Sequence, residues 1–444
     1  MICQIQRWKD LERWVPGGDN DWECLHTLIP LEDLLTPRAE HVRVKQTLGD
    51  WTPITIHFDG SVVPRERDMP FKGAMFAAYP GDLVFSKIDV RNGAIGLIPD
   101  SMPKAVVTSE YPVHTPDTRQ VEARYLTMLL RTPNFLKLIR TAASGTSGRK
   151  RITPEDFRAI EIPLPEPKDQ RRLVAAYQKA LDKAATLDVQ ALQIERDAQR
   201  EFEAALGLTP PPHLPKRPFQ ITRFRDIERW SHEGILQTAL LGDAPPESKF
   251  DIVQLGDIAT VSYGLQKCPG NRPGKHARPY LRVANVQRGY LDLREIKTIN
   301  VPDADMSKYR LETGDVLLCE GNSPDLVGRG SIWGNEIPDC VHQNHVLRVR
   351  VHERRAIPEF LLAYINSPSG RAYFRSKAKR TTNLASINSK EVAGLPLPLP
   401  DDTMTQGAIV RDLRQGQDSA TSKLKQASAL RTGARNDFIA AVFA

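Results

Sequence analysis

Two long stretches of the chain repeat apolar residues at alternating spacings of four and three. The first runs from about Lys168 to Leu206 and the second from about Met404 to Val442. This spacing is typical of the seam of a coiled-coil helix, and about 39 residues of helix would be ~58 Å long. The first seam contains Leu173, Tyr177, Ala180, Ala184, Leu187, Ala191, Ile194 and Ala198; the second contains Leu413, Ala420, Ala427, Ala434 and Ala441, and Ile409, Leu424, Leu430 and Phe438 widen it.

The alanine-rich seams also bear on how these helices are buried. Small side chains allow two helices to approach closely, so the simplest arrangement packs one helix antiparallel against the other. The alternative is that each helix packs on its own domain, which would use the same apolar stripes.

The segments before each long helix follow a strand pattern. Trp51–Phe58, Asp82–Ser86 and Val346–Val351 are rich in β-branched, apolar or aromatic residues, and Gly, Pro and Asp turns separate such runs. Helical stretches follow at Ala123–Arg140 and Pro358–Lys379, and a Pro-Leu-Pro sequence then precedes each long helix. The sequence therefore predicts an α+β fold in which mixed sheets and helices alternate with two long helices.

The chain is also an internal repeat. Arg7–Trp14 matches Arg223–Trp230 at a shift of 216, and Gly81–Phe85 matches Gly314–Leu318 at a shift of 233. The Ile-Pro-Leu-Pro segment that ends at position 165 matches Leu-Pro-Leu-Pro at a shift of 235. Several matches in one order at nearly constant shift predict two copies of one module, related by a pseudo-two-fold repeat.

Composition narrows the class of protein. The 444 residues are 40% hydrophobic, and no apolar run approaches the roughly 18 residues that a membrane span needs. The first residues, Met-Ile-Cys-Gln-Ile-Gln-Arg-Trp, show no apolar signal region. Five scattered cysteines without a Cys-x-x-Cys pair make a disulfide framework improbable. We therefore expect a folded protein of a reducing cytoplasm.

Positive charge is concentrated in two windows that contain no acidic residue. The windows hold Arg131, Lys137, Arg140, Arg149, Lys150 and Arg151 between positions 131 and 151, and Arg371, Arg375, Lys377, Lys379 and Arg380 between positions 366 and 386. Their eleven charges exceed the net charge of +7 of the whole chain. One such run alone could be a solvated face, but its recurrence at equivalent positions favours a surface for a nucleic-acid phosphate backbone.

Two such modules held apart by a paired helical spacer would suit a bipartite DNA target, because half-sites one turn apart lie ~34 Å from each other. Base reading requires Arg, Lys, Asn or Gln at groove edges. The candidates in the strand-and-turn regions are Lys87, Arg91 and Asn92 in the first module, and Arg278, Arg282, Asn285, Gln287, Arg288, Asn322 and Arg329 in the second.

The sequence lacks a convincing catalytic constellation. It has no P-loop, and Asn322-Ser-Pro-Asp325 lacks the second proline and the aromatic of an amino-methyltransferase site. Glu166-Pro-Lys168 and Glu295-Ile-Lys297 have a nuclease-like spacing without a credible upstream Asp. The Cys340–His345 segment could offer metal ligands, but a polar turn explains it better, because strand residues alternate faces and no second ligand group completes a tetrahedron. We expect no catalysis, no metal and no cofactor on this chain.

Taken in order, these features resemble the specificity subunit of type I restriction–modification enzymes over essentially the whole chain. Arg278–Asp292 resembles the opening of a target-recognition domain, and the two Gly-Asp segments resemble its central turn. Gly148–Thr153, followed by Pro-Leu-Pro and Asp169-Gln170, resembles its exit into a conserved helix. The first module lacks a clear Tyr-Leu-Arg-Val-Ala-Asn counterpart, and the second exit places its Gln one residue off the 235 shift.

The resemblance implies a layout and a set of partners. The expected layout is an N-terminal segment (1–20), target-recognition domain 1 (21–165), spacer helix 1 (166–206), a Pro-rich linker (207–221), target-recognition domain 2 (222–400) and spacer helix 2 (401–444). The two helices would form an antiparallel coiled coil that separates the domains. It would dock two methyltransferase (modification) subunits, through residues such as Leu173, Tyr177, Leu187, Ile194, Ile409, Leu413, Leu424 and Phe438.

The same resemblance assigns the chemistry to partners in a bacterial or archaeal cytoplasm. The modification subunits would bind S-adenosylmethionine and methylate adenine N6 in double-stranded DNA, and a restriction subunit would use ATP and Mg. Two alternatives stay open: the same fold as the targeting subunit of a methylation-only or other phage-defence system, and a non-catalytic coiled-coil scaffold. A self-sufficient methyltransferase or nuclease is disfavoured by the missing motifs.

Overall fold

The structure is a computed structural model that describes residues 26–43, 47–66, 73–142, 151–209, 221, 223, 235, 247–352, 355–380 and 384–443. The repeated segment Arg7–Trp14 lies outside these residues, as does its second copy except for Arg223. Contacts divide the chain into two compact units: Met1–Asp188 with Lys425–Ala444 (unit 1), and Val189–Leu424 (unit 2). In the described part of the chain, no helix combines the length and apolarity needed to cross a bilayer.

Unit 1 is built from short strands and helices followed by the first half of a long helix. Its elements are β1 (Leu28–Pro30), α1 (Leu31–Leu34), β2 (Leu35–Arg38), β3 (Thr52–Ile56), β4 (Val62–Pro64), β5 (Met75–Ala78), β6 (Leu83–Phe85), the 3-10 helix η2 (Val90–Asn92), β7 (Ile95–Leu97), β8 (Ala105–Thr108), β9 (Val113–Pro116), α2 (Ala123–Leu130), α3 (Pro133–Ala142), α4 (Pro154–Arg158), β10 (Glu161–Pro163) and the long helix α5 (Pro167–Ala205), which continues into unit 2.

Unit 2 repeats this plan and ends in the second long helix. Its elements are β11 (Ile252–Gln254), α7 (Leu255–Ile258), β12 (Ala259–Ser262), η4 (Pro269–Asn271), β13 (Ala277–Leu281), β14 (Lys297–Asn300), η5 (Asp303–Asp305), α8 (Met306–Tyr309), β15 (Val316–Cys319), β16 (Gly321–Asn322), β17 (Gly330–Ile332), β18 (Val341–His342), β19 (Val346–Val351), α9 (Pro358–Asn366), α10 (Pro368–Lys377), β20 (Lys379–Arg380), β21 (Ala385–Ser386), α11 (Ser389–Ala393), β22 (Pro396–Pro398) and α12 (Thr403–Val442), whose last part belongs to unit 1.

The strand pairing confirms the internal repeat. The antiparallel sheet β2-β9-β6-β7 of unit 1 corresponds to β12-β19-β15-β17 of unit 2, and the parallel pair β3–β8 corresponds to β13–β18. Each unit also has an antiparallel two-stranded pair, β1–β10 or β11–β22. The second strand of each pair is the last strand before a long helix. The described residues of the two units differ at their margins. The β5–β8 pair of unit 1 is reduced in unit 2 to one antiparallel bridge between Arg310 and Val341, and the small sheet β16-β21-β20 of unit 2 has no counterpart among the described residues of unit 1.

The matched Gly-Asp segments are tight turns that bury a carboxylate. Asp82 is 2% exposed and accepts hydrogen bonds from the Arg38 guanidinium at 2.8 and 3.2 Å. Asp315 is 1% exposed and accepts from Arg350 at 2.7 and 2.8 Å. A buried carboxylate needs such a partner, because an unpaired charge in the core is strongly destabilising. The arginine comes from a different strand of the sheet in each unit, β2 in one and β19 in the other.

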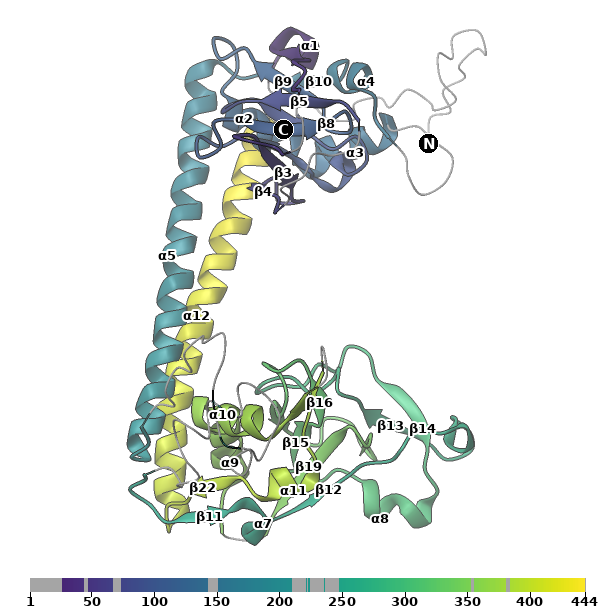
Figure 1. Cartoon of the computed structure of the whole chain (residues 1–444), viewed down its shortest axis with the longest axis vertical. Coiled ribbons are helices and arrows are strands. Elements are labelled where there is room, and N and C mark those ends of the chain that lie inside the picture. Colours follow the sequence, from purple (N-terminus) through teal and green to yellow (C-terminus); the bar gives the residue numbers. More distant parts are fainter. Residues whose placement is uncertain are drawn as a thin grey trace. The chain divides into compact units, whose positions relative to one another are not determined.

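The two long helices form an antiparallel coiled coil, as the seams predict (Figure 1). In unit 1, Tyr177 contacts Phe438 with ring centroids 6.3 Å apart, and Asp188 pairs with Arg431. Residue numbers therefore increase along α5 in the direction in which they decrease along α12, so the two helices run antiparallel. In unit 2, Lys423 Nζ lies 3.0 Å from the Gln190 side-chain oxygen, again in antiparallel register. The alanines at the centre of the seam are buried, namely Ala184, Ala191, Ala420 and Ala427.

The end of one long helix completes the core of each unit. In unit 1, Phe438 of α12 packs against Tyr125 of α2, with ring centroids 5.7 Å apart. In unit 2, Phe202 of α5 packs against Phe360 of α9 at 6.2 Å. Both cores therefore depend on a helix that begins after the other module's Pro-Leu-Pro exit.

A fully buried glutamine anchors the start of each long helix. Gln170 accepts a hydrogen bond from Glu122 N at 2.8 Å and donates to the carbonyls of Gln120 and Pro165. Gln406 makes the same three bonds with Ile357 N and the carbonyls of Arg355 and Pro400. The one-residue offset of Gln406 in sequence therefore leaves its role unchanged.

Replacing Gln170 by Ala should lower the free energy of unfolding by about 2 kcal/mol, because it leaves the buried Pro165 carbonyl and the part-buried Glu122 N–H and Gln120 carbonyl without this partner. Urea unfolding, with hydrogen exchange of the Glu122 amide as a local probe, measures the effect. The control is Gln178→Ala, since Gln178 lies exposed on the same helix. Equal stability of the two variants would show that Gln170 is not an anchor.

Unit 1 also buries a neutral histidine. His114 is 1% exposed and stacks on Phe85, and neither ring nitrogen has a hydrogen-bond partner among the described residues. Burial, assisted by the charge of Arg158, lowers its pKa to about 4, against the opposing charges of Asp82 and Glu155. In the unfolded chain this histidine has an ordinary pKa near 6.5. As the pH falls below that value, the unfolded chain therefore binds a proton at His114 while the folded chain does not, which favours unfolding.

We expect the free energy of unfolding to fall by roughly 2 kcal/mol on this account as the pH decreases from about 6.5 to about 4.5. His114→Leu should lose correspondingly less stability over that range, while both proteins respond alike to pH above about 8. Urea melts at a series of pH values measure this. Parallel pH profiles of the two proteins would contradict the burial of a neutral His114.

Candidate nucleic-acid interface

The basic window of unit 2 forms a cluster of arginines around α10. Arg371 and Arg375 lie on this helix, and Arg288 approaches them from the loop after β13. Burial, together with the positive charges of Arg371, Arg329 and Arg375, lowers the pKa of Arg288 to about 10, and only Asp325 opposes them. Arg288 Nη1 and Arg371 Nε have no hydrogen-bond partner among the described residues. Such a group of like charges would be stabilised by a bound anion.

The carboxylate beside the cluster does not neutralise it. Arg375 lies 3.6 Å from Asp325, and Arg288 donates to the Asp325 backbone carbonyl at 3.0 Å. The Asp325 side chain is 85% exposed, so solvent weakens this ion pair. The cluster therefore keeps a net positive charge at the surface.

Unit 1 has the equivalent arrangement around α3. Arg140 Nε donates to the Arg91 carbonyl of η2 at 3.3 Å. In the repeat Arg140 corresponds to Arg375 of unit 2, which lies beside Asp325. Lys137 is exposed on the same helix. Arg151 is exposed and lies 3.3 Å from Glu110, whereas Arg149 and Lys150 lie outside the described residues. In both units the helix of the basic window therefore lies beside a loop that carries predicted base-contact residues: Arg91 in unit 1 and Arg288 in unit 2.

Four of those predicted contacts hold the fold together instead. Asn285 is 2% exposed, accepts from Arg282 N and donates to the carbonyls of Asp292 and Glu295. Arg329 is 8% exposed and donates to the carbonyls of Val286 and Val283. Arg282 also donates to the Glu295 carbonyl, and Arg278 pairs with Asp303 and Asp339. In this conformation these side chains stabilise the loop between β13 and β14, and their assignment as base contacts stays a prediction.

The other predicted contacts lie nearer the surface. Asn92 and Lys379 are exposed, and Lys87, Arg91, Gln287, Asn322 and Lys377 are half-buried. Gln287 donates to the Ala284 carbonyl and Asn322 accepts from Ser323 N, so both are partly engaged in turns. The side chain of Arg380 lies outside the described part of the structure. These positions remain predictions for base or phosphate contact.

The segment Cys340–His345 is a buried strand followed by a more exposed turn. Cys340 and His342 are 1% and 0% exposed, and burial raises the pKa of the Cys340 thiol to about 12. His342 Nδ1 lies 2.7 Å from the Val346 carbonyl, and burial lowers the pKa of its ring to about 4. No group of three or more His, Cys, Asp or Glu side chains among the described residues could hold a metal ion.

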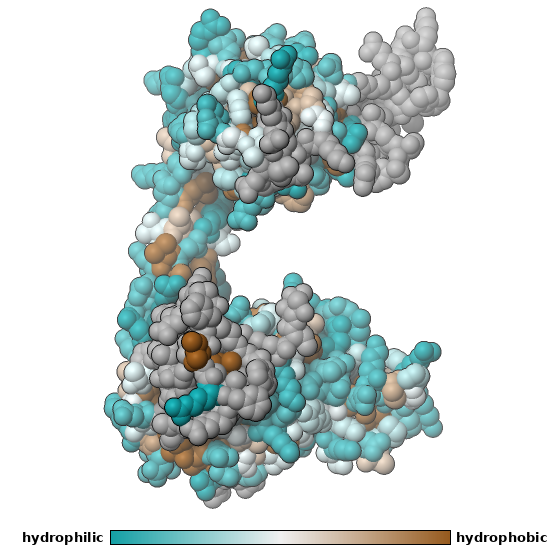
Figure 2. Space-filling view, in the orientation of Figure 1, coloured by the Kyte–Doolittle hydropathy of each residue, from teal (hydrophilic) through white to brown (hydrophobic). Residues whose placement is uncertain are grey.

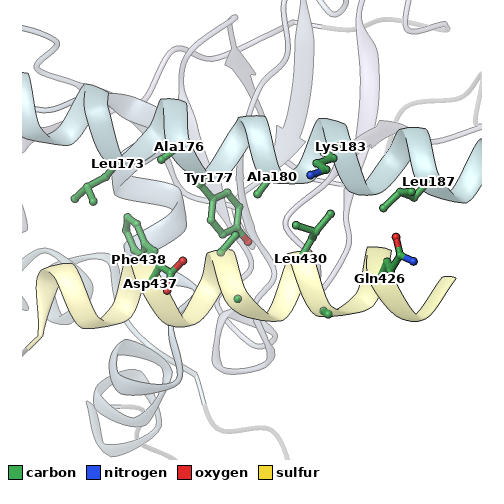
Figure 3. Close-up of a pocket in the computed structure, with 13 residues that line it drawn as sticks. Leu173, Ala176, Tyr177, Ala180, Lys183, Leu187, Gln426, Leu430, Asp437 and Phe438 are labelled. Atoms are coloured by element: carbon green, nitrogen blue, oxygen red, sulfur yellow. The ribbon is translucent and has the colours of Figure 1, made fainter. Parts of the chain in front are cut away.

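A second surface feature lies on the helix pair. A groove of about 510 Å³ runs between α5 and α12 in unit 1, and Tyr177 and Leu430 point into the space between the two helices (Figure 3). Leu173, Leu187, Gly433 and other side chains of both helices complete the lining, which is mostly small or apolar but also includes Lys183, Gln426 and Asp437. Figure 2 shows hydrophobic residues at the surface of the helix pair. Such a groove suits the side chains of another protein.

The predicted coiled-coil residues divide between this groove and the buried seam. Leu173, Tyr177, Leu187 and Phe438 line the groove. Ile409 and Leu413 are buried in the core of unit 2, Ile194 is half-buried, and Leu424 is 50% exposed. Leu424 therefore contributes to the surface of the pair and not to its seam.

Comparison with known proteins places these features in a family context. No protein-family model matches the chain. It is 23% identical over 278 residues to the type I restriction enzyme EcoKI specificity subunit of Escherichia coli (strain K12), covering 62% of this chain and 54% of that protein. It is 26% identical over 175 residues to a protein described as a type I restriction enzyme MjaX specificity subunit, of Methanocaldococcus jannaschii, covering 39% of this chain and 40% of that protein. The matched region thus spans about half the length of these curated relatives.

The fold is shared more widely than the sequence. A solved structure from work on complex assembly and conformational transition of the type I R-M system superposes with a TM-score of 0.56 at 17% identity, covering 94% of this chain and 96% of that one.

Proposed function

Because this chain is related to the specificity subunits of type I restriction enzymes, we propose that it recognises a bipartite sequence in double-stranded DNA and directs partner subunits to it. The observation that carries the proposal is the repeat of one basic surface in both units: α3 with η2 in the first, and α10 with the Asp325 loop in the second. Two equivalent phosphate-binding surfaces on one chain suit two half-sites.

The arginine cluster is the part of this surface best suited to phosphate. Guanidinium groups donate several hydrogen bonds in a fixed plane and match phosphate oxygens. Binding of a phosphate beside Arg371 and Arg375 would supply the negative charge that Asp325 alone does not. Phosphate contacts position the chain on the duplex, and side chains that differ between the modules then read the bases.

The chemistry belongs to the partners in this proposal. Two methyltransferase subunits, which hold S-adenosylmethionine, would methylate adenine N6 after base flipping. They dock on the coiled coil, for which the groove beside Tyr177 and Leu430 offers an apolar surface. A restriction subunit, in a full restriction system, brings ATP and Mg. The chain itself serves as a non-catalytic targeting subunit of the bacterial or archaeal cytoplasm.

Changing Arg371 and Arg375 together to Ala should weaken binding to duplex DNA of any sequence. For every phosphate that the variant no longer neutralises, the slope of log affinity against log salt should flatten by about 0.9. Fluorescence anisotropy with a random-sequence duplex across a salt series measures this. The matched control is Arg196→Ala with Arg411→Ala, two exposed arginines of the long helices in the same unit. An unchanged slope in the α10 variant would remove this helix from the DNA surface.

Filling the groove should displace the modification subunits. An added Cβ at Gly433 would meet no atom within 4 Å, so Gly433→Leu fits the fold and gains helix propensity while its side chain enters the groove. We expect affinity for the co-expressed modification subunits to fall about tenfold or more, or about 1.4 kcal/mol, by mass photometry. Gly433→Ala is the control and should retain the partners. Full assembly of the Leu variant would mean that the partners dock elsewhere.

A further inference from the structure

Each unit presents one strongly exposed aromatic ring on a tight turn. Phe58 is 60% exposed and Tyr290 is 62% exposed, and they are the most exposed Phe, Tyr or Trp side chains of the described residues. A single exposed apolar side chain needs no explanation. Two exposed rings on equivalent turns of a repeat, each beside arginine side chains, do require an explanation.

The turn of unit 1 joins β3 to β4 and is held rigidly. His57 N donates to the Ser61 carbonyl at 2.9 Å, and Gly60 has a φ of 81°, which favours glycine. The turn rests on the chain after η2, because a Cβ added at Gly93 would lie 2.5 Å from the Phe58 carbonyl oxygen. The backbone of Phe58 is therefore fixed while its ring stands in solvent.

The turn of unit 2 is built in the same way. Gln287 N donates to the Tyr290 carbonyl at 3.0 Å, and Gly289 has a φ of 82°. Gly289 N donates at 2.8 Å to the carbonyl of Gly330 in β17. The first turn packs closely on Gly96 of β7, the strand that corresponds to β17, since a Cβ added at Gly96 would lie 2.4 Å from the Gly60 carbonyl oxygen. Both rings are thus carried by a glycine turn clamped to the same strand of the repeated sheet.

Arginines flank both turns. In unit 1 the Arg131 guanidinium packs against Gly60, and its Nε has no hydrogen-bond partner among the described residues. The Asp59 carboxylate of the same turn partly opposes its charge. In unit 2, Arg288 belongs to the turn itself and lies close to Arg371 and Arg375. An exposed ring next to guanidinium groups matches a polymer that alternates flat apolar bases with phosphates.

We propose that Phe58 and Tyr290 are equivalent base-stacking residues, each inserting against a base step of one half-site while the neighbouring arginines hold the adjacent phosphates. This inference rests on the proposed function. Aromatic or apolar wedges at a base step unstack it and bend the duplex. Such a distortion would lower the cost of extruding a nearby adenine for a partner methyltransferase.

The two turns also differ in a way that suits two different half-sites. Phe58 precedes its glycine by two residues, whereas Tyr290 follows its glycine by one. The hydroxyl of Tyr290 adds a hydrogen-bond donor and acceptor that Phe58 lacks. If the two units recognise different half-sites, their rings can stack on a base in the same way while differing in position on the turn and in hydrogen-bonding capacity.

The test separates ring stacking from mere apolar contact and from charge. Phe58→Leu combined with Tyr290→Leu keeps apolar bulk and removes both rings, while Phe58→Tyr combined with Tyr290→Phe keeps both rings. Binding of the full chain to a randomised duplex pool is measured by anisotropy across a salt series. The same pool, with thymine replaced by 5-iodouracil, is then photocrosslinked to the wild-type chain, and the crosslinked peptides are identified by mass spectrometry.

We expect the Leu pair to bind about tenfold more weakly or worse, with an unchanged salt slope because no charge is removed, and the ring-keeping pair to bind as the wild type does. Crosslinks should map to Phe58 and Tyr290. Wild-type affinity of the Leu pair, or crosslinks confined to other residues, overturns the proposal. So does a Leu pair that binds DNA normally but loses the modification subunits, since the rings would then be protein contacts. If the wild-type chain itself shows no salt-dependent DNA binding, the proposed function fails first.

Discussion

The antiparallel packing of α5 against α12 is the constraint on which the rest of this chain depends. Neither helix can bury its apolar seam alone, and each completes the core of a unit with an aromatic near its end, Phe202 in one case and Phe438 in the other. The small seam residues allow the close approach, and Gln170 and Gln406 fix where each helix leaves its sheet. The two domain cores and the groove between the helices therefore all depend on the same helix pairing.

The second organising feature is a division of labour among the charged and polar side chains. Those of the loop between β13 and β14, such as Asn285 and Arg278, satisfy one another and the backbone. Those of α10 and the neighbouring turn, such as Arg288 and Arg375, repel one another with little compensation. The first group stabilises the fold, and the second would be stabilised by an anion that the chain does not itself supply. The proposed DNA surface is thus placed where positive charge has few opposing carboxylates, not where it is most abundant.

The sequence was sufficient for the large features and not for the contacts. Seven-residue spacing predicted both long helices, and ordered matches predicted the repeat, because both patterns are properties of the chain alone. The roles of Asn285 and Arg329 could not be predicted, since a side chain that ties a loop and one that reads a base use the same donors. Phe58 and Tyr290 were missed because exposure of a ring depends on the turn beneath it. A glycine next to a lone aromatic was the only available signal.

The central claim is that this chain directs adenine methylation to a two-part DNA sequence. Single-molecule sequencing of the host genome with and without its gene, scored for N6-methyladenine, tests that claim most directly. We predict that deletion abolishes methylation at one split, asymmetric motif and leaves every other methylated motif intact. The gap in that motif would give the separation of the two half-sites. An unchanged methylome in the deletion strain would contradict the claim.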